Sequence, residues 1–461
     1  MNKGIPDKEN FAMTPLFAPF NRIKSALNED GVEGSMTQES EEIYNTADTK
    51  LVRSFPRHFP GPPSKDRKPE EVYIVESKGN LKRKAGEVFS VSNLYLAMPS
   101  LAPHQPNLPL AAKARAILKE FAKYDAGFNE IEKAAQRPYF WFHLEYERGT
   151  FVLLPHLGKM RSVTRSFDFR ASARLSAGDT QGALQDIKTI LSMSKGLSQE
   201  PALMSHLVAY SLSSFAIGTL FEGLVMCGWN EEQLAEAEFV LSGFDWLAAC
   251  EIAWVGEMAF MNHAFDRVLN GSALEKKAFI NFWMPGPLEP VFSISGWVRR
   301  NQLNYNRAFI DLDPLLVDVK SRRVYAGKFV EDPLPELGFH YFINRLQNDP
   351  RSSRVPRNFA RAQTDFDLAR VAIALERYRL KEKNYPDSLE ALVPTYLEPV
   401  PHDIMDGKPL RYVRKQDDYQ LYSVGWNQED DGGTHVPNSH QQADWVWHSK
   451  ATNPEAPSDT D

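Results

Sequence analysis

The sequence predicts an α+β protein, in which a mainly α-helical body precedes a C-terminal module made of one long helix packed on a small antiparallel β-sheet. Apolar residues recur three and four positions apart in long segments between Ala111 and about Leu269, which is the spacing of packed amphipathic helices. Near the C-terminus the apolar period changes to two, which indicates strands. Helices followed by a run of strands are typical of the α+β class.

The chain has 461 residues, more than one compact core usually contains, so two or three domains are expected. Its 43% hydrophobic and 25% charged residues are ordinary globular values. Prolines and polar stretches then suggest the boundaries. We expect an extended, proline-rich region at 1–110, a helical body at 111–347, the C-terminal module at 348–449 and a disordered tail at 450–461.

Charge and cysteine content set aside two classes of protein. The net charge of -7 is spread along the chain without a basic block, which argues against a nucleic-acid surface. Cys227 and Cys250 both lie in apolar stretches that look helical, where a free cysteine usually behaves as a small buried hydrophobe. We expect buried thiols and no disulfide framework.

Neither a signal peptide nor a membrane span is expected in the printed sequence. The first twenty residues contain acids and prolines and lack the continuous apolar core that a signal peptide needs. Leu207 to Trp229 approaches membrane length but carries Glu222, and an isolated carboxylate in lipid costs several kcal/mol. This segment is therefore interpreted as a buried core helix.

The N-terminal region offers few signals of regular structure. From Lys24 to Gly86 the chain is polar and includes a proline-rich run at 55–63, which predicts extended or loop-like structure. A second proline run at 99–109 should act as a semi-rigid boundary, because each proline fixes φ and removes a backbone donor.

The helical body contains a predicted hairpin between Arg170 and Leu191. Gly178 can stop its first helix and Asp179 can cap its second. The turn resembles a single tetratricopeptide hairpin over about 25 residues, but no second copy follows, and a solenoid needs about three repeats. An ordinary αα-hairpin is the alternative. Another helix is expected from Asn230 to Phe239, with acids in its first turn.

The pattern weakens after the helix predicted at Leu247 to Leu269. The segment from Ala278 to Ala308 mixes tryptophans and prolines and predicts no element. The stretch near Arg322 has short apolar bursts that fit either loops or one strand pair.

In the C-terminal module, Phe366, Val371, Leu375 and Tyr378 form the apolar face of a helix that runs to about Lys383. We expect Asn384 to adopt the left-handed cap and Pro386 to prevent continuation. A short helix should follow, with Asp387 as N-cap and Glu390 completing a capping box. Two strands joined by the turn Lys415 to Asp418 and a third at 444–447 complete the module.

The order of these motifs resembles the C-terminal domain of the major pseudopilins of type II secretion. A long helix precedes YPDSLEALVPTYLEPVPHD, the hairpin DGKPLRYVRKQDDYQLYSVG and an acidic loop with glycines, NQEDDGG. The likeness spans about ninety residues. In that family the loop after the second strand binds calcium, so the resemblance implies a calcium site at Asp430, Asp431 and Asp444.

The residue types fit that implication, because calcium takes six to eight oxygens and carboxylates on a bent loop supply them. An EF-hand is excluded, since Asn438 stands where the bidentate glutamate is required. The alternative is that Asp430 and Asp431 only cap and solvate a turn, as Asp-Gly pairs often do.

The resemblance covers only the end of the chain. A pseudopilin begins with a prepilin-peptidase cleavage motif and an apolar helix. Here about 350 residues without this resemblance precede the module. The N-terminal PDKENFAMTPLFAPF is similar to the juxtamembrane stretch of large bacterial envelope proteins that carry this module. An upstream anchor, the only membrane contact expected, would place the protein at the cell envelope, on the periplasmic side; if Met1 is the true start, it is cytoplasmic.

Catalytic motifs are missing from the sequence. It contains no Walker loop, dinucleotide fingerprint, HExxH, CxxC or GxSxG. His263, Asp266 and Arg267 are interpreted as a solvated or helix-pairing cluster. Three histidines match no zinc spacing and are interpreted as ordinary histidines: His435, His440 and His448. A set of aromatic residues is interpreted as core packing: Tyr139, Phe140, Trp141, Phe142, Trp283, Trp297 and Trp445.

The function expected from these observations is a non-catalytic, envelope-associated or exported bacterial scaffold. Its helical body would bind another protein and its module would be stabilised by calcium. Two alternatives stay open: a hydrolase with a site between the body and the module, and a cytoplasmic adaptor that uses its helical hairpins as a peptide groove.

Overall fold

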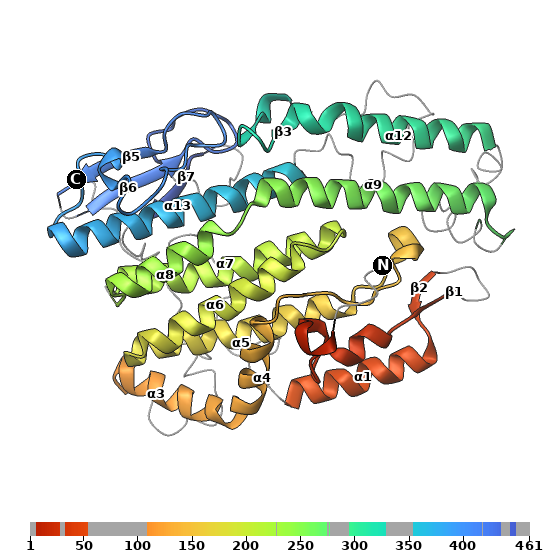
Figure 1. The fold of residues 1–461 in the computed structure, drawn as a ribbon, viewed down its shortest axis with the longest axis horizontal. Helices are drawn as coiled ribbons and strands as arrows, with labels where there is room; N and C mark the ends of the chain where they lie inside the picture. The colour runs from red at the N-terminus through yellow and green to blue at the C-terminus, as the bar shows by residue number, and fades with distance from the viewer. Residues whose placement is uncertain are drawn as a thin grey trace, which may run out of the picture.

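The computed structural model describes residues 6–27, 33–53, 108–226, 228–273, 276, 295–328, 354–416, 418–434 and 443–448. Within these ranges the protein is mainly helical with small antiparallel sheets, as the α+β prediction requires at this level (Figure 1). The helices are α1 (Gln38–Arg53), α3 (Leu110–Phe121), α4 (Asp125–Ala135), α5 (Pro155–Ala177), α6 (Thr180–Leu197), α7 (Leu203–Val225), α8 (Glu231–Ser242), α9 (Trp246–Asn270), α12 (Ser295–Leu316) and α13 (Arg354–Glu382).

Three small sheets accompany the helices. Their strands are β1 (Ser25–Leu27) with β2 (Glu33–Met36), β3 (Val317–Asp318) with β4 (Arg323–Val324), and β5 (Arg411–Lys415), β6 (Asp418–Ser423) and β7 (Trp445–His448). Every pairing is antiparallel. The pair β3–β4 decides between the two interpretations of the segment near Arg322, in favour of strands.

The N-terminal segment is packed onto the body through aromatic side chains. Short 3-10 turns at Phe11–Met13 and Ala18–Arg22 bury Phe11, Phe17 and Phe20. The expected extended structure from Lys24 to Gly86 is wrong for 38–53, where a stretch without proline forms α1 with acids in its first turn. The proline runs at 55–63 and at 99–107 and the tail at 450–461 lie outside the described residues.

Helices α5 and α6 form the predicted hairpin. Gly178 ends α5 with φ +88°, a left-handed conformation that glycine adopts without steric cost. The Asp179 carboxylate then accepts a hydrogen bond of 2.9 Å from the Gly182 amide and caps α6. A capping box between Asn230 and Gln233 likewise starts α8.

Helix α7 runs through the middle of the body, against α5 and α6 (Figure 1). Its buried Glu222 accepts a hydrogen bond of 2.8 Å from Ser172 of α5, which satisfies the carboxylate. By length and composition, α7 and the segment Glu231–Asn270, which contains α8 and α9, are apolar enough to cross a membrane. Cys250 is buried in α9, as predicted, and Cys227 lies outside the described residues.

Helix α12 is an element that the sequence pattern did not predict. It lies beside α9 at one edge of the molecule (Figure 1). Polar side chains join the two helices: Asn306 donates to Asn262 at 2.8 Å and Gln302 donates to Asp266 at 3.2 Å. The helix-pairing interpretation of Asp266 is therefore confirmed.

In the C-terminal module, α13 lies between the sheet β5–β6–β7 and helices α7, α8 and α9. The strand pairing agrees with the predicted hairpin, with Lys415 opposite Asp418, and with the third strand. Phe221 of α7 and Trp447 of β7 pack edge to face, with their ring centroids 5.6 Å apart. The sheet and the body therefore share a hydrophobic core around this helix.

Two predicted helix ends are wrong in detail. The left-handed residue after α13 is Lys383, with φ +65°, and not Asn384. Its side chain donates to the carbonyl of Leu380 at 2.8 Å, so the lysine itself caps the last turn. The capping box of Asp387 is also wrong, because that carboxylate pairs with Arg414 and only a 3-10 turn forms at Leu389–Leu392.

Candidate functional site

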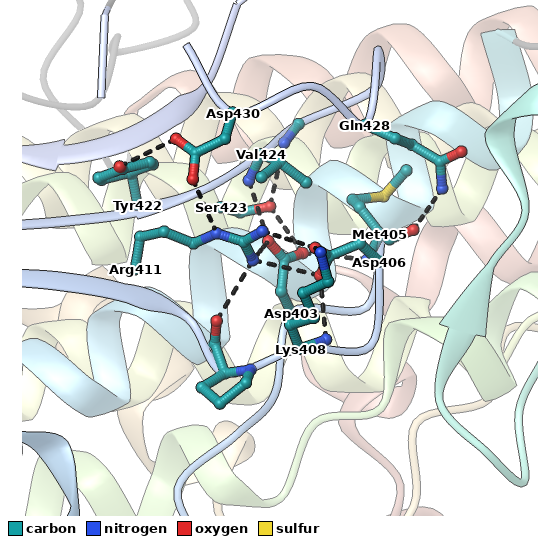
Figure 2. Close-up of polar contacts among 12 residues, drawn as sticks. Asp403, Met405, Asp406, Lys408, Arg411, Tyr422, Ser423, Val424, Gln428 and Asp430 are labelled. Carbon is teal, nitrogen blue, oxygen red and sulfur yellow. Dashed lines mark hydrogen bonds and ion pairs between the residues drawn. The ribbon is translucent and has the colours of Figure 1, made fainter. Parts of the chain in front are cut away.

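The candidate site is a corner of the C-terminal module where three loops meet. The first loop precedes β5 and carries Asp403 and Asp406, the second follows β6 and carries Asp430 and Asp431, and the third leads into β7 with Asp444. Figure 2 shows the first two of these loops with Arg411 between them. Carboxylates from distant parts of the sequence are thus collected at one end of the sheet.

Asp403 is the buried anchor of this corner. Its carboxylate accepts hydrogen bonds from the Val424 amide at 2.9 Å, the Met405 amide at 3.0 Å and the Ser423 hydroxyl at 2.8 Å. Burial raises the pKa of Asp403 and these three donors oppose the rise. Asp403 therefore ties the loop before β5 to the end of β6.

Arg411 begins β5 and faces three carboxylates (Figure 2). Its guanidinium lies 2.5 Å from Asp406, 3.3 Å from Asp403 and 3.4 Å from Asp430. Hydrogen bonding to Asp406 is the largest cause of its raised pKa, burial opposes that rise, and the charges of Asp406 and Asp403 add to it. The Arg411 guanidinium thus pairs with carboxylates of both acidic loops.

Asp430 is half exposed and accepts three contacts. The Tyr422 hydroxyl donates to its Oδ1 at 3.0 Å, the Gly432 amide donates to the same oxygen at 3.1 Å, and Arg411 reaches its Oδ2. Burial alone would raise the pKa of Asp430, but the amide, the hydroxyl and the guanidinium outweigh burial and lower it. This carboxylate is therefore held in its charged form.

Asp444 differs from the other carboxylates because one of its oxygens lacks a partner. The side chain is 2% exposed, its Oδ2 accepts from the Gly433 amide at 2.7 Å, and its Oδ1 accepts no hydrogen bond from the described residues. Burial raises the pKa of Asp444, the amides of Gly433 and Asp431 oppose the rise, and the charges of Asp431 and Asp430 add to it. A buried, unsatisfied carboxylate oxygen is costly unless a cation or a water molecule binds it.

Asp431 is exposed and accepts a hydrogen bond of 3.0 Å from Asn427. Gly432 and Gly433 both have positive φ, which folds the loop back toward Asp444. Across the described part of the chain, no three His, Cys, Asp or Glu side chains are close enough together to hold a metal ion. The three predicted aspartates thus lie on one corner and influence each other's charge without forming a closed ligand set.

The donor chemistry at this corner nevertheless suits calcium. The available groups are hard carboxylate oxygens, which calcium prefers, and Asp444 offers a buried oxygen that accepts no hydrogen bond from the described residues. Asp444, Asp430 and Asp431 are the residues that would hold the ion. When bound, the ion would supply positive charge between loops that otherwise repel one another.

Sequence reasoning missed Asp403, Asp406 and Arg411. The signal was present in HDIMDGKPLR, where two acids and an arginine occur within nine residues just before a predicted strand. Nothing in that pattern indicates that the arginine also reaches Asp430, nineteen positions further on.

A second polar cluster lies deep in the helical body. Glu200 accepts from His156 at 3.0 Å and from the Ser205 hydroxyl at 2.5 Å, while His206 Nε2 lies 2.7 Å from the Glu200 carbonyl. All four residues are at most 2% exposed. The Ser205 hydroxyl donates to the Glu200 carboxylate and not to an imidazole nitrogen. This arrangement therefore does not activate the hydroxyl as a nucleophile.

The junction between the body and the module contains paired charges. Asp367 of α13 accepts from Gln363 at 3.1 Å and from Arg322 at 3.3 Å, and Tyr210 of α7 donates to Asp365 at 2.8 Å. These contacts hold the two parts together. Among the described residues, the carboxylates named here are paired with neighbouring donors.

The remaining predicted residues fall into two groups. His435, His440, Asn438 and Trp283, together with the side chain of His448, lie outside the described residues. Among the aromatics, Phe142 stacks on His156 at 4.0 Å, Phe140 stacks on Phe11 at 4.5 Å, and Trp297 and Trp445 are buried, which agrees with the packing interpretation. That interpretation is wrong for Tyr139, which is 43% exposed.

Compared with known protein families, curated proteins and solved structures, the chain matches none of them.

Proposed function

We propose that the protein is a non-catalytic scaffold of the bacterial cell envelope, or an exported one, whose pseudopilin-like C-terminal module is stabilised by calcium. The observation that carries the proposal is Asp444, a buried carboxylate with one oxygen unpartnered among the described residues, beside the charges of Asp430 and Asp431. A divalent cation would satisfy that oxygen and relieve the repulsion.

The expected affinity supports a location outside the cytoplasm. Asp430 is half exposed and Asp431 is exposed, so we expect a weak site with a dissociation constant on the order of 0.1 to 1 mM. Such a site fills only where calcium is abundant. The motif resemblance of the last ninety residues to pseudopilins points in the same direction. Sequencing of the adjoining reading frame tests for an anchor upstream of Met1.

Binding of another protein by the helical body is part of this proposal. The body exposes large apolar side chains, including Phe239 of α8 at 76%, Met204 at 55% and Val255 of α9 at 56%. Singly exposed apolar side chains are ordinary on protein surfaces, and only a contiguous apolar patch marks a protein contact. Cross-linking of the purified chain in envelope extracts, with mass spectrometry of the linked sites, tests whether these residues are covered.

Calcium dependence is tested on the whole chain by denaturant unfolding in calcium, in magnesium and in chelator. At a hundredfold excess over its dissociation constant, bound calcium is expected to raise the free energy of unfolding by about 2.7 kcal/mol. Magnesium should give less, because it demands a tight octahedral shell.

The matched variant is Asp444→Asn, which keeps the size and the acceptor for Gly433 but removes the charge. It is expected to abolish the calcium response, as is the double change of Asp430 and Asp431 to alanine. No calcium response in the wild type, or an equal response in Asp444→Asn, would contradict the proposed calcium site.

A further inference from the structure

Arg411 holds one of the predicted calcium ligands. The Oδ2 atom of Asp430 faces the Arg411 Nε at 3.4 Å (Figure 2). The Oδ1 atom of Asp444 is buried and accepts no hydrogen bond from the described residues. Asp430 is thus held by the arginine, and the described residues contain no closed ligand set. A cation that used both carboxylates would have to draw Asp430 away from the arginine.

The contact between Arg411 and Asp430 is the weakest of the three that the arginine makes. Arg411 lies 2.5 Å from Asp406, a side chain only 14% exposed, but 3.4 Å from Asp430, which is 47% exposed. Exposed ion pairs of this kind contribute about 0 to 1 kcal/mol. Asp430 can therefore leave the guanidinium at small cost.

Arg411 itself would stay in place after such an exchange. Asp406 and Asp403 both remain within 3.3 Å of its guanidinium, and the carbonyl of Pro409 accepts from it at the same distance. The arginine thus has two permanent carboxylate partners and one exchangeable partner.

We propose that Arg411 is a tethered counter-ion of the calcium site: it binds the Asp430 carboxylate until calcium displaces it, and so sets the calcium affinity. The inference rests on the proposed calcium function and adds the residue that regulates the site. Its physical basis is competition, because the guanidinium already pairs with the Asp430 carboxylate and two cations close to one carboxylate repel each other.

The size of the effect follows from Coulomb's law. A unit positive charge about 6 Å from a divalent cation in a water-like dielectric weakens binding by about tenfold. Arg411→Gln in the full chain is therefore expected to lower the calcium dissociation constant by about tenfold, as measured by isothermal titration calorimetry. The three donors to Asp403 remain in this variant, which favours a folded corner.

Arg414→Gln is the matched control. Arg414 lies on the same strand and its removal changes the net charge equally, but it pairs with Asp387 and not with the acidic loop. Its affinity should stay within about twofold of the wild type, since exposed charges farther away are screened. Equal tightening in both variants would overturn the proposal, because it would show a general charge effect and not a tethered counter-ion.

A measurement on the wild type keeps the test valid if the glutamine variant does not fold. The Nε–H resonance of Arg411 is expected to shift during a calcium titration, while that of Arg414 stays fixed. Calcium binding without that shift, or with unchanged affinity in Arg411→Gln, overturns the counter-ion role and leaves the calcium function standing. Absence of calcium binding in the wild type and in Arg411→Gln overturns both, whereas binding in Arg411→Gln alone supports the counter-ion role in its strongest form.

Discussion

Glu200 fixes the protonation of a histidine by using its own backbone. A carbonyl oxygen only accepts hydrogen bonds, so the contact of 2.7 Å between the Glu200 carbonyl and His206 Nε2 requires the proton to be on Nε2. The other ring nitrogen, Nδ1, is buried and has no partner among the described residues. A neutral imidazole tolerates this position far better than a charged one.

His206 should therefore make the protein less stable in acid. Burial lowers its pKa from 6.5 to about 4, so the unfolded chain takes up the proton first as the pH falls. The free energy of unfolding should lose about 3 kcal/mol between pH 6.5 and 4 from this group alone. The measurement is denaturant unfolding across that range.

His206→Gln isolates this contribution, because the glutamine amide can still donate to the Glu200 carbonyl but does not titrate. Its stability is expected to fall less steeply with decreasing pH than that of the wild type. His143→Gln, on an exposed histidine, is the control and should follow the wild type. A pH profile of His206→Gln that matches the wild type would contradict the assignment.

At the scale of residues, the sequence predicted which acidic residues gather at the corner better than it predicted which side chains contact one another. Asp430 and Asp444 were predicted together, and they do influence each other across one loop. Arg411 was missed because its three carboxylate partners lie five, eight and nineteen positions away in two different loops. No local periodicity relates such positions, and only the folded sheet brings them together.

At the scale of elements, the best predictions came from stop and start signals. Gly178, Asp179 and Asn230 each mark a helix end by a local backbone requirement or a local side-chain bond, so the sequence alone locates them. Helix α12 lacked such a signal. Its buried residues include Trp297, Val298 and Tyr305, the helix packs on α9, and much of its sequence is polar.

Helix α5 offers a pair of glycines that separates backbone strain from packing. Gly178 has φ +88°, Gly158 is helical, and an added Cβ would meet no atom within 4 Å at either position. Gly178→Ala is therefore expected to cost about 1 kcal/mol through left-handed strain alone. Gly158→Ala should instead stabilise the protein by roughly 0.5 to 1 kcal/mol, because alanine loses less backbone entropy in a helix.

Both changes are measured as shifts of the denaturation midpoint at constant slope. The predicted signs are opposite although the chemical change is the same. Two shifts of the same sign would contradict the view that the conformation at residue 178, and not its surroundings, ends α5.

At the scale of the whole molecule, α13 joins the C-terminal module to the body. Val371, Ala372, Ile373, Ala374 and Leu375 are all fully buried. Five consecutive residues of an α-helix point in directions 100° apart and so cover its entire circumference. One side of this helix meets the sheet and the other meets α7, α8 and α9.

The module is therefore not expected to fold when residues 354–448 are produced alone. Without the body, the side of α13 that carries Phe359 and Phe366 would face water, as would Trp447, which packs on Phe221. Each buried aromatic of this kind contributes on the order of 1.5 to 3 kcal/mol, which is a large part of the stability of a domain of about a hundred residues. The expected result is a broad, non-cooperative thermal transition with weak near-ultraviolet circular dichroism.

Co-production of residues 1–347 as a separate chain supplies the missing surface and should restore a cooperative transition in a purified complex. A native-like spectrum and a sharp transition for 354–448 alone would instead mean that the contacts with α7, α8 and α9 are dispensable. For the same reason, we expect calcium to bind at Asp444 only in the whole chain or in this complex. The loop that carries Asp430 is attached to a sheet, and that sheet needs α13 held in place by the body.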